Sequence, residues 1–297
     1  MVVVIVITGI IVAAVARFVG PTVTGYVDAT RRAELVDIAD TALRRIGRDL
    51  HNALPNSVRV TNVGSVYYLE YLDVRTGGRY RADAHSAPPN CLTLPACPCD
   101  DTRAGVTDND ILSFYQSPSV LTDTCFKTLG NIPNQAQIVN TDFVVVFNLG
   151  ILGASAYESP NTNKSLISGT STSGSEDRIA FAAQTFRLAS PGNRFDVITG
   201  PVSYVCTPDP VNPVNGTLKR YWGYAIAPLQ PTPPAGGSNA LLASNVSACT
   251  FTYNAAANPM TQRNGLVTLS LSVTEVSSQG QSETVSLYEA AHVSNVP

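Results

Sequence analysis

The first 54 residues constrain the fold most, because their pattern is that of one long helix. Met1 to Ala16 contain no charged residue, and Arg17 is the first charge in the chain. After residue 21 apolar residues recur at three- and four-residue steps, which is the period of one helix face. They are Leu35, Val36, Ala39, Ala42, Leu43, Ile46, Leu50 and Ala53. Pro55 ends the pattern, since proline cannot continue the helical hydrogen-bond ladder.

The apolar start predicts a membrane-spanning segment over residues 1–20. Its sixteen uncharged residues are slightly fewer than the ~20 that a spanning helix needs. A signal peptide is one alternative, because Ala14-Val15-Ala16 fits a small-residue cleavage site. Two facts oppose a signal peptide: the chain has no basic region before the apolar run, and the helical pattern continues past Arg17. A buried core helix is the other alternative, and it does not explain why the apolar stretch leads into a long amphipathic extension.

Gly20 and Pro21 predict a kink or a loosened joint in this helix. Proline removes one backbone donor and clashes with the preceding turn. Alternatively, Pro21 ends one helix and begins another, because proline also suits a first helical turn. Both interpretations place a joint at this point.

Composition excludes a nucleic-acid partner and favours an extracytoplasmic, β-rich domain. The formal net charge is −3 and only 14% of the residues are charged, so no basic surface is available for a phosphate backbone. The surface is expected to consist of Ser, Thr, Asn, Gly and Pro instead. At 297 residues the chain is long enough for one large domain or two smaller ones.

Six cysteines in loop-like sequence predict disulfides in an oxidising compartment. Cys206 and Cys249 lie apart from the others in the sequence and are expected to pair with each other. The other four cysteines leave two options, 91–97 with 99–125 or 91–99 with 97–125. They are Cys91, Cys97, Cys99 and Cys125. A four-thiolate metal site is the rival interpretation, but no C-x-x-C pair is present.

The rest of the chain predicts antiparallel strands. Ser57 to Val74 is rich in β-formers, and a turn at Thr76-Gly77-Gly78 would return the chain as a hairpin. The segment from Asp142 to Leu149 is apolar enough to be buried on both faces. Residues 151–177 are low in apolar content and are expected to form a long mobile loop.

The predicted fold class is therefore α+β. A long N-terminal helix, membrane-spanning at first and amphipathic after that, packs on an antiparallel β-sheet head. The helix takes residues 1–54, with 1–20 in the membrane or a filament core. The disulfide-containing head takes residues 55–297.

No catalytic, cofactor or metal site is expected, and an enzyme is not predicted. The three histidines, His51, His85 and His292, are far apart in the sequence and would have to be brought together by the fold to act. The segment Asp108-Asn109-Asp110 lacks the further spaced oxygens of a calcium loop, so a turn is the simpler interpretation.

The helical segment resembles the N-terminal helix of the type IV pilins and pseudopilins. The resemblance lies in VVVIVITGIIVAAVARFVGPTVTGYVDATRRAELVDIADTALRRIGRDLHNALPNSVRV, from Val2 to Val60. The later fragments RFDVITGPVSYVC and HVSNVP resemble minor pilins of the mannose-sensitive haemagglutinin pilus system (MshO type). The family's leader, cleavage site and glutamate would precede Met1. We therefore hypothesise that Met1 is an internal methionine.

The resemblance implies a minor pilin or pseudopilin, a structural subunit that acts in filament assembly or at the filament tip. Its partners would be other pilins through the N-terminal helix, the inner-membrane assembly platform and inner-membrane lipid. The subunit would be a single-pass inner-membrane protein with a periplasmic head, and later part of a cell-surface pilus. The residues assigned to the membrane or filament core are Val2, Val3, Val4, Ile5, Val6, Ile7, Ile10, Ile11 and Val12.

A binding function is the alternative, in which an adhesin or glycan-binding head is carried by a pilin-like anchor. Aromatic side chains could contact a ligand, although core packing would explain most of them. They are Tyr67, Tyr68, Tyr71, Tyr80, Trp222 and Tyr224.

Overall fold

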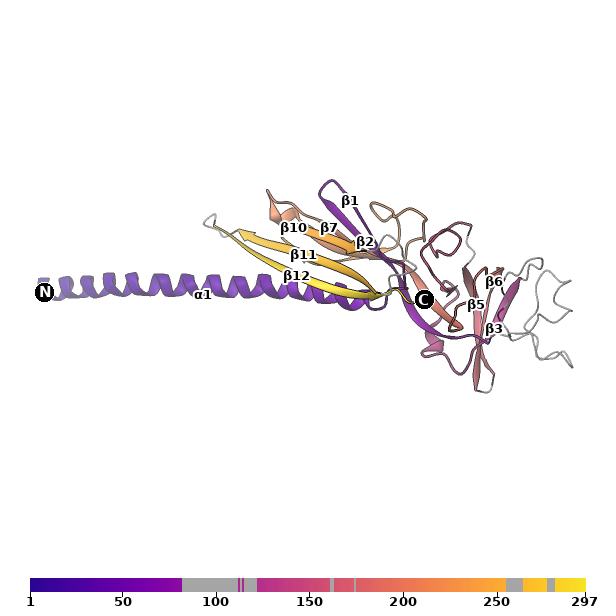
Figure 1. The fold of residues 1–297 in the computed structure, drawn as a ribbon. Coiled ribbons are helices and arrows are strands. Elements are labelled where there is room, and N and C mark those ends of the chain that lie inside the picture. The colour runs from indigo at the N-terminus through magenta and orange to yellow at the C-terminus, as the bar shows by residue number, and fades with distance from the viewer. Residues whose placement is uncertain are drawn as a thin grey trace.

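The fold was analysed in a computed structural model. It describes residues 1–81, 112, 114, 122–160, 163–173, 175–254, 264–276 and 281–297, apart from the side chains of residues 16, 18–24, 27 and 28. One long helix, α1 (Val2–Leu50), precedes two antiparallel sheets, and two short 3₁₀ segments, η1 (Gln135–Gln137) and η2 (Pro213–Asn215), lie in the connections. Figure 1 shows α1 as a rod whose N-terminal part projects beyond the β-strands.

The helix α1 is continuous through Gly20 and Pro21, so the predicted joint is not a break in the helix. A proline in a helix removes one hydrogen bond, but the flanking turns can maintain the helical path. At ~1.5 Å per residue, 49 residues make a rod about 74 Å long.

The larger sheet has nine strands in the described residues. They are β1 (Arg59–Val63), β2 (Val66–Arg79), β3 (Asp123–Lys127), β4 (Phe143–Val146), β5 (Lys164–Ser173), β6 (Glu176–Gln184), β7 (Arg194–Thr207), β8 (Thr217–Trp222) and β9 (Ser238–Ser244). The order is β1-β2-β7-β4-β5-β6-β3, and β8 joins β7 to β9 off this path.

Strand β7 connects the two ends of this sheet. Along one side it pairs with β2 over nearly its whole length. On the other side Phe195 to Ile198 pair with β4, whereas Val202 to Thr207 pair with β8. The two long strands therefore form a ribbon that runs from the part of the molecule next to α1 to the part farthest from it, where β3, β5 and β6 lie (Figure 1).

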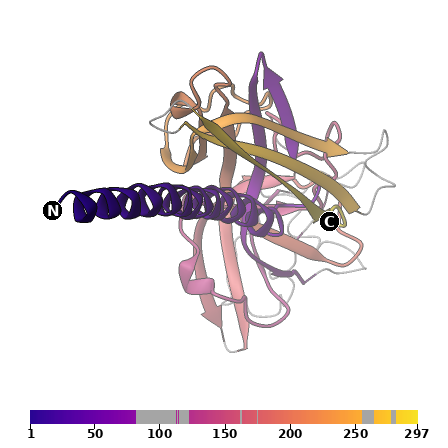
Figure 2. The same ribbon diagram turned by 90° about the vertical axis from the view of Figure 1, so that its left-hand side faces the viewer.

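The smaller sheet packs against the second half of the helix. It contains β10 (Val246–Asn254), β11 (Asn264–Val276) and β12 (Ser282–Ser294), in that order. Figure 2 shows β11 and β12 crossing beside the helix. Buried residues of α1, of this sheet and of β2, β7, β8 and β9 form one hydrophobic core. The helix contributes Leu35, Ala39, Ala42, Leu43, Ile46 and Leu50, which share one face at helical spacing.

A second core fills the end of the body farthest from the helix. It is aromatic, and Phe126 lies at its centre, with its ring centroid 5.0 Å from that of Phe195 and 5.9 Å from that of Phe181. Strand β4 is buried on both faces, as predicted. Val144 and Val146 face this core, and Val145 faces a third cluster that lies between the two cores.

The predicted fold class is wrong in two respects. First, the described chain is mainly antiparallel β-sheet in two separate sheets, and it is not a long helix with a single-sheet head. Second, no helix in the described part of the chain is both long and apolar enough to cross a membrane. The apolar run before Arg17 is short of the ~20 residues that a span requires. The predicted transmembrane helix and the single-pass inner-membrane localisation are corrected accordingly.

Two local predictions are also wrong. Thr76-Gly77-Gly78 is not a turn, because β2 continues through it. A Cβ atom on Gly77 would come within 2.9 Å of the Phe195 carbonyl oxygen, so glycine here permits a close approach of two strands. The predicted mobile loop contains β5 and the start of β6, which form a hairpin. Ile167 anchors that hairpin in the aromatic core and is almost fully buried.

Candidate functional site

The N-terminal half of α1 exposes an unusual amount of apolar surface. All nine residues assigned to a membrane or filament core are exposed, from 52% at Ile7 to 76% at Val2. Met1 and Val15 are exposed as well. In Figure 1 this part of the rod lies clear of both sheets.

These apolar side chains surround the helix instead of forming one stripe. Consecutive residues from Val2 to Ile7 are all Val or Ile, and each residue turns the helix by ~100°. A helix that is apolar all round belongs in an environment that covers it on every side, whereas a single stripe suits a single partner. Thr8, the polar residue within the run, donates its hydroxyl to the Val4 carbonyl oxygen at 2.7 Å. The run therefore offers no side-chain hydrogen-bond donor that needs water.

The second half of α1 is fixed to the body by ion pairs as well as by its buried face. Arg32 Nε lies 2.8 Å from Glu283 Oε1 on β12. Near the end of the helix, Asp49 Oδ2 accepts from Arg220 Nε at 2.9 Å and from the Tyr204 hydroxyl at 2.5 Å. The rod therefore has a definite direction relative to the sheets, from which its exposed half projects.

The structure locates half of the predicted cysteines. Cys206 on β7 and Cys249 on β10 form a disulfide, with Cα atoms 6.6 Å apart, which ties the larger sheet to the smaller one. Cys125 on β3 is also disulfide-bonded. Cys91, Cys97 and Cys99 lie outside the described residues, so the choice between the two predicted pairings stays open.

The aromatic residues proposed as ligand contacts belong mostly to the protein interior. Tyr71 and Tyr80 are fully buried, and Tyr68 and Tyr224 are nearly so. Tyr67 and Trp222 pack partly buried against the core around α1.

Of the histidines, His51 and His292 line one groove of about 590 Å³ between α1 and β12, together with Arg44, Arg48 and Glu289. His85 and the segment Asp108-Asn109-Asp110 lie outside the described residues. In the part of the chain that the structure describes, no three His, Cys, Asp or Glu side chains are grouped as metal ligands.

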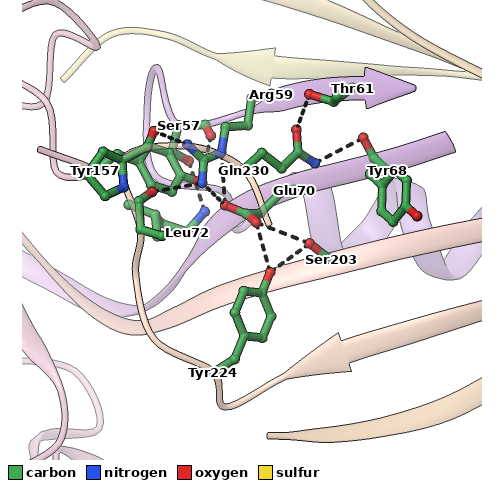
Figure 3. Close-up of polar contacts among 12 residues, drawn as sticks. Ser57, Arg59, Thr61, Tyr68, Glu70, Leu72, Tyr157, Ser203, Tyr224 and Gln230 are labelled. Atoms are coloured by element: carbon green, nitrogen blue, oxygen red, sulfur yellow. Dashed lines mark hydrogen bonds and ion pairs between the residues drawn. The ribbon is translucent and has the colours of Figure 1, made fainter. Parts of the chain in front are cut away.

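A buried polar network is centred on Glu70 of β2 (Figure 3). The Arg59 guanidinium bonds Glu70 Oε1 through two nitrogens, at 2.9 and 2.5 Å. The other carboxylate oxygen accepts from Tyr224 at 3.1 Å and from Ser203 at 3.3 Å. Burial raises the pKa of Glu70, and the charge of Arg59 opposes that rise. The sequence contained a signal for this network, because Glu70 is a lone charge within the strand run Val66 to Leu72.

The network also fixes the segments around it. Arg59 donates to the carbonyl oxygens of Ala227 at 3.0 Å and Pro228 at 2.8 Å, which holds the loop after β8. The same guanidinium lies 3.7 Å above the ring centroid of Tyr157, whose hydroxyl donates to the Ser57 carbonyl oxygen at 3.0 Å. Tyr157 is thereby held by Arg59 and the Ser57 carbonyl oxygen, and Tyr224 is held by its hydrogen bond to Glu70.

These two tyrosines form part of the wall of a cavity of about 610 Å³. Phe143 on β4, Lys164 on β5 and Thr199 on β7 form other parts of the wall. The Lys164 ammonium donates to the Ala156 carbonyl oxygen and lies 5.8 Å from the ring centroid of Phe143. Burial lowers the pKa of Lys164 to about 8. The sequence gives no signal for this cavity, because its lining residues come from separate segments and form no motif.

Comparisons with known protein families, with curated proteins and with solved structures gave no match.

Proposed function

We propose that this chain is a structural subunit of a filament of the type IV pilin kind, held together by its N-terminal helix. The observation that carries the proposal is the exposed apolar half of α1, which projects from a folded β-rich body. The occupant of this surface is the same helix of neighbouring subunits, and the bodies lie on the outside of the resulting bundle.

The free energy gained by burying the exposed apolar residues of α1 is large enough to support assembly. Burial of a Val or Ile side chain contributes about 1.5–3 kcal/mol relative to full exposure. Nine partly exposed residues therefore represent on the order of 10 kcal/mol, which is comparable with the ~4–15 kcal/mol lost when subunits associate. Because each subunit can contact several neighbours in a bundle, assembly multiplies this gain.

The all-round distribution of the apolar residues supports a multi-helix bundle over a simple dimer. A two-helix contact would cover one stripe and leave the opposite face of Val2 to Ile7 in water. The polar second half of the rod is already covered on one face by β11 and β12, so the bundle is confined to the projecting half. The resemblance of Val2 to Val60 to pilin helices points the same way.

The experiment compares assembly of the wild-type chain with an Ile7→Lys/Ile11→Lys variant. Both residues are exposed, so the substitutions leave the folded body intact while they place charges in the bundle core. We expect sedimentation velocity and negative-stain microscopy to show large assemblies for the wild type and mainly single chains for the variant. Val36→Lys is the control, because Val36 is also exposed but lies on the half of the helix beside the body. Equal assembly of wild type and double variant would overturn the proposal.

A further inference from the structure

The cavity lined by Phe143, Tyr157, Lys164, Thr199 and Tyr224 has the properties of a small-ligand site. Its volume of about 610 Å³ lies within the range of ligand pockets, ~300–1,000 Å³. It lies where β4, β5 and β7 meet the loop after β8, beside the third hydrophobic cluster, to which Phe143, Tyr157 and Ile226 belong. None of the residues in its wall belongs to the helix surface on which the proposed assembly depends.

The wall combines three kinds of chemistry. Phe143, Ile226 and the tyrosine rings supply apolar surface. Thr141, Ser159 and Thr199 supply hydroxyl groups, and Glu158 supplies a carboxylate that also accepts the Gly153 amide at 2.9 Å. Lys164 supplies the positive charge.

The charge of Lys164 has a definite role in ligand choice. Burial lowers its pKa to about 8, so the ammonium is still mostly protonated at pH 7. A partly buried cation is stabilised by an anion that enters the same low-dielectric space. Its Nζ is held by the Ala156 carbonyl oxygen above the Phe143 ring, which gives the charge a fixed position.

The walls on the other side are rigid. Tyr157 is held by Arg59 and by the Ser57 carbonyl oxygen, and the Tyr224 hydroxyl lies 2.6 Å from Ser203 Oγ (Figure 3). Both tyrosine hydroxyls are thus engaged by neighbouring groups, and both residues line the cavity. A site with rigid walls binds its ligand with little loss of conformational entropy.

We propose that this cavity binds an acidic sugar, a pyranose that carries one carboxylate. The carboxylate pairs with Lys164, the sugar hydroxyls bond to the threonines, Ser159 and Glu158, and the C–H face of the ring packs on Phe143. A neutral sugar has no charge to pair with Lys164, and a simple aliphatic carboxylate has no hydroxyl groups to bond to the threonines and Ser159. The chain is thereby a sugar-binding protein as well as a filament subunit.

The test measures binding of sodium D-glucuronate to the full-length chain. Saturation-transfer NMR is the method, because it tolerates large assemblies. We expect glucuronate to bind at least tenfold more tightly than either D-glucose or acetate. Absence of glucuronate binding at tens of millimolar would overturn the proposal. Acetate binding as tight as that of glucuronate would also overturn it, because the cavity would then recognise only the charge.

Two substitutions and one control locate the binding. Lys164→Met is expected to weaken glucuronate binding at least tenfold, whereas Lys219→Met on β8 leaves it unchanged. Ile226→Glu, at another lining residue, places a repelling charge in the cavity and is expected to give a similar loss without altering Lys164. Unchanged binding in both Lys164→Met and Ile226→Glu would contradict the assignment of the site.

The pH dependence provides an independent readout. Glu158 is the other charged side chain in the wall, and burial places the pKa of Lys164, at about 8, within the range from pH 7 to 9.5. We expect wild-type affinity for glucuronate to fall severalfold over this range, and the residual affinity of Lys164→Met to stay constant. A flat wild-type profile would contradict pairing with Lys164. Since assembly uses the helix alone, failure of any of these tests leaves the filament proposal unaffected.

Discussion

Glu70 illustrates, at the scale of single residues, how a buried charge depends on its partners. Its side chain is almost completely buried on β2, and the Arg59 guanidinium, the Tyr224 hydroxyl and the Ser203 hydroxyl satisfy its oxygens. An ionised carboxylate without these partners would be strongly unfavourable in this environment. The sequence could indicate that Glu70 needed a partner, but the partners come from positions 59, 203 and 224, which only the fold brings together.

The first prediction is that Arg59→Met lowers the free energy of unfolding by about 3–5 kcal/mol at pH 7, because a buried charge loses its partner. Urea unfolding at pH 7 measures this difference. Arg44→Met is the matched control, because Arg44 forms a surface pair with Asp40 that water screens well. It should change stability far less. Equal effects of the two substitutions would contradict the account of the network.

The second prediction concerns pH. Without Arg59 the folded-state pKa of Glu70 rises further above its ordinary value, since Arg59 is the main influence that lowers it. A group with a raised folded pKa favours folding below its unfolded pKa, and that contribution is lost as pH rises through the folded pKa. The penalty of Arg59→Met should therefore be smaller at pH 4 than at pH 7. Unfolding of both proteins at the two pH values tests this, and a penalty that grows toward pH 4 would contradict it.

At the scale of elements, the sequence predicted what periodicity encodes and missed what long-range pairing decides. The buried face from Leu35 to Leu50 followed from its helical spacing, and burial of β4 on both faces followed from its apolar run. Gly77 and Gly78 have turn-like composition, yet β7 pairs across them and extends the strand. The Ser- and Thr-rich segment of β5 looked like a loop because it has few apolar residues, yet it pairs with β4 on one side and β6 on the other.

The third prediction is that Leu43→Ala lowers the free energy of unfolding by about 2–5 kcal/mol, because Leu43 is buried between the helix and the sheets. Ile10→Ala, on the exposed half of the same helix, should leave it unchanged. Urea unfolding of unassembled chains would measure the free energy of unfolding of both variants. A comparable loss in Ile10→Ala would mean that the N-terminal half of α1 contacts the body.

The fourth prediction is that Cys206→Ser/Cys249→Ser lowers the free energy of unfolding by up to about 4 kcal/mol. The disulfide closes a loop with a sequence separation of 43 residues, and its removal increases the entropy of the unfolded chain. Denaturant unfolding without reductant isolates this bond from the other disulfides. No change in stability would show that the link between β7 and β10 adds nothing to the packing around it.

At the scale of the whole molecule, the boundary between the folded body and the projecting rod falls within a single helix, α1. One half of α1 belongs to the hydrophobic core, and the other half leaves the body as an apolar rod (Figure 1). The sequence placed this change near residue 20, whereas in the described residues the helix first meets the body near Arg31, which pairs with Glu275 on β11. It did not predict the proportion of strand to helix, because the twelve strands in the described residues depend on contacts between distant segments.

Site-specific cross-linking between copies at the exposed rod tests whether the N-terminal helices of neighbouring subunits form a bundle. Ile11→Cys and Arg45→Cys each introduce one thiol, and the described native cysteines are already disulfide-bonded. With a short bismaleimide, we predict that assembled Ile11→Cys chains form covalent dimers in high yield, because helices meet in the bundle at residue 11. Arg45→Cys, exposed on the half beside the body, should yield few. Absence of dimers at residue 11, or equal yields at both positions, would contradict the account.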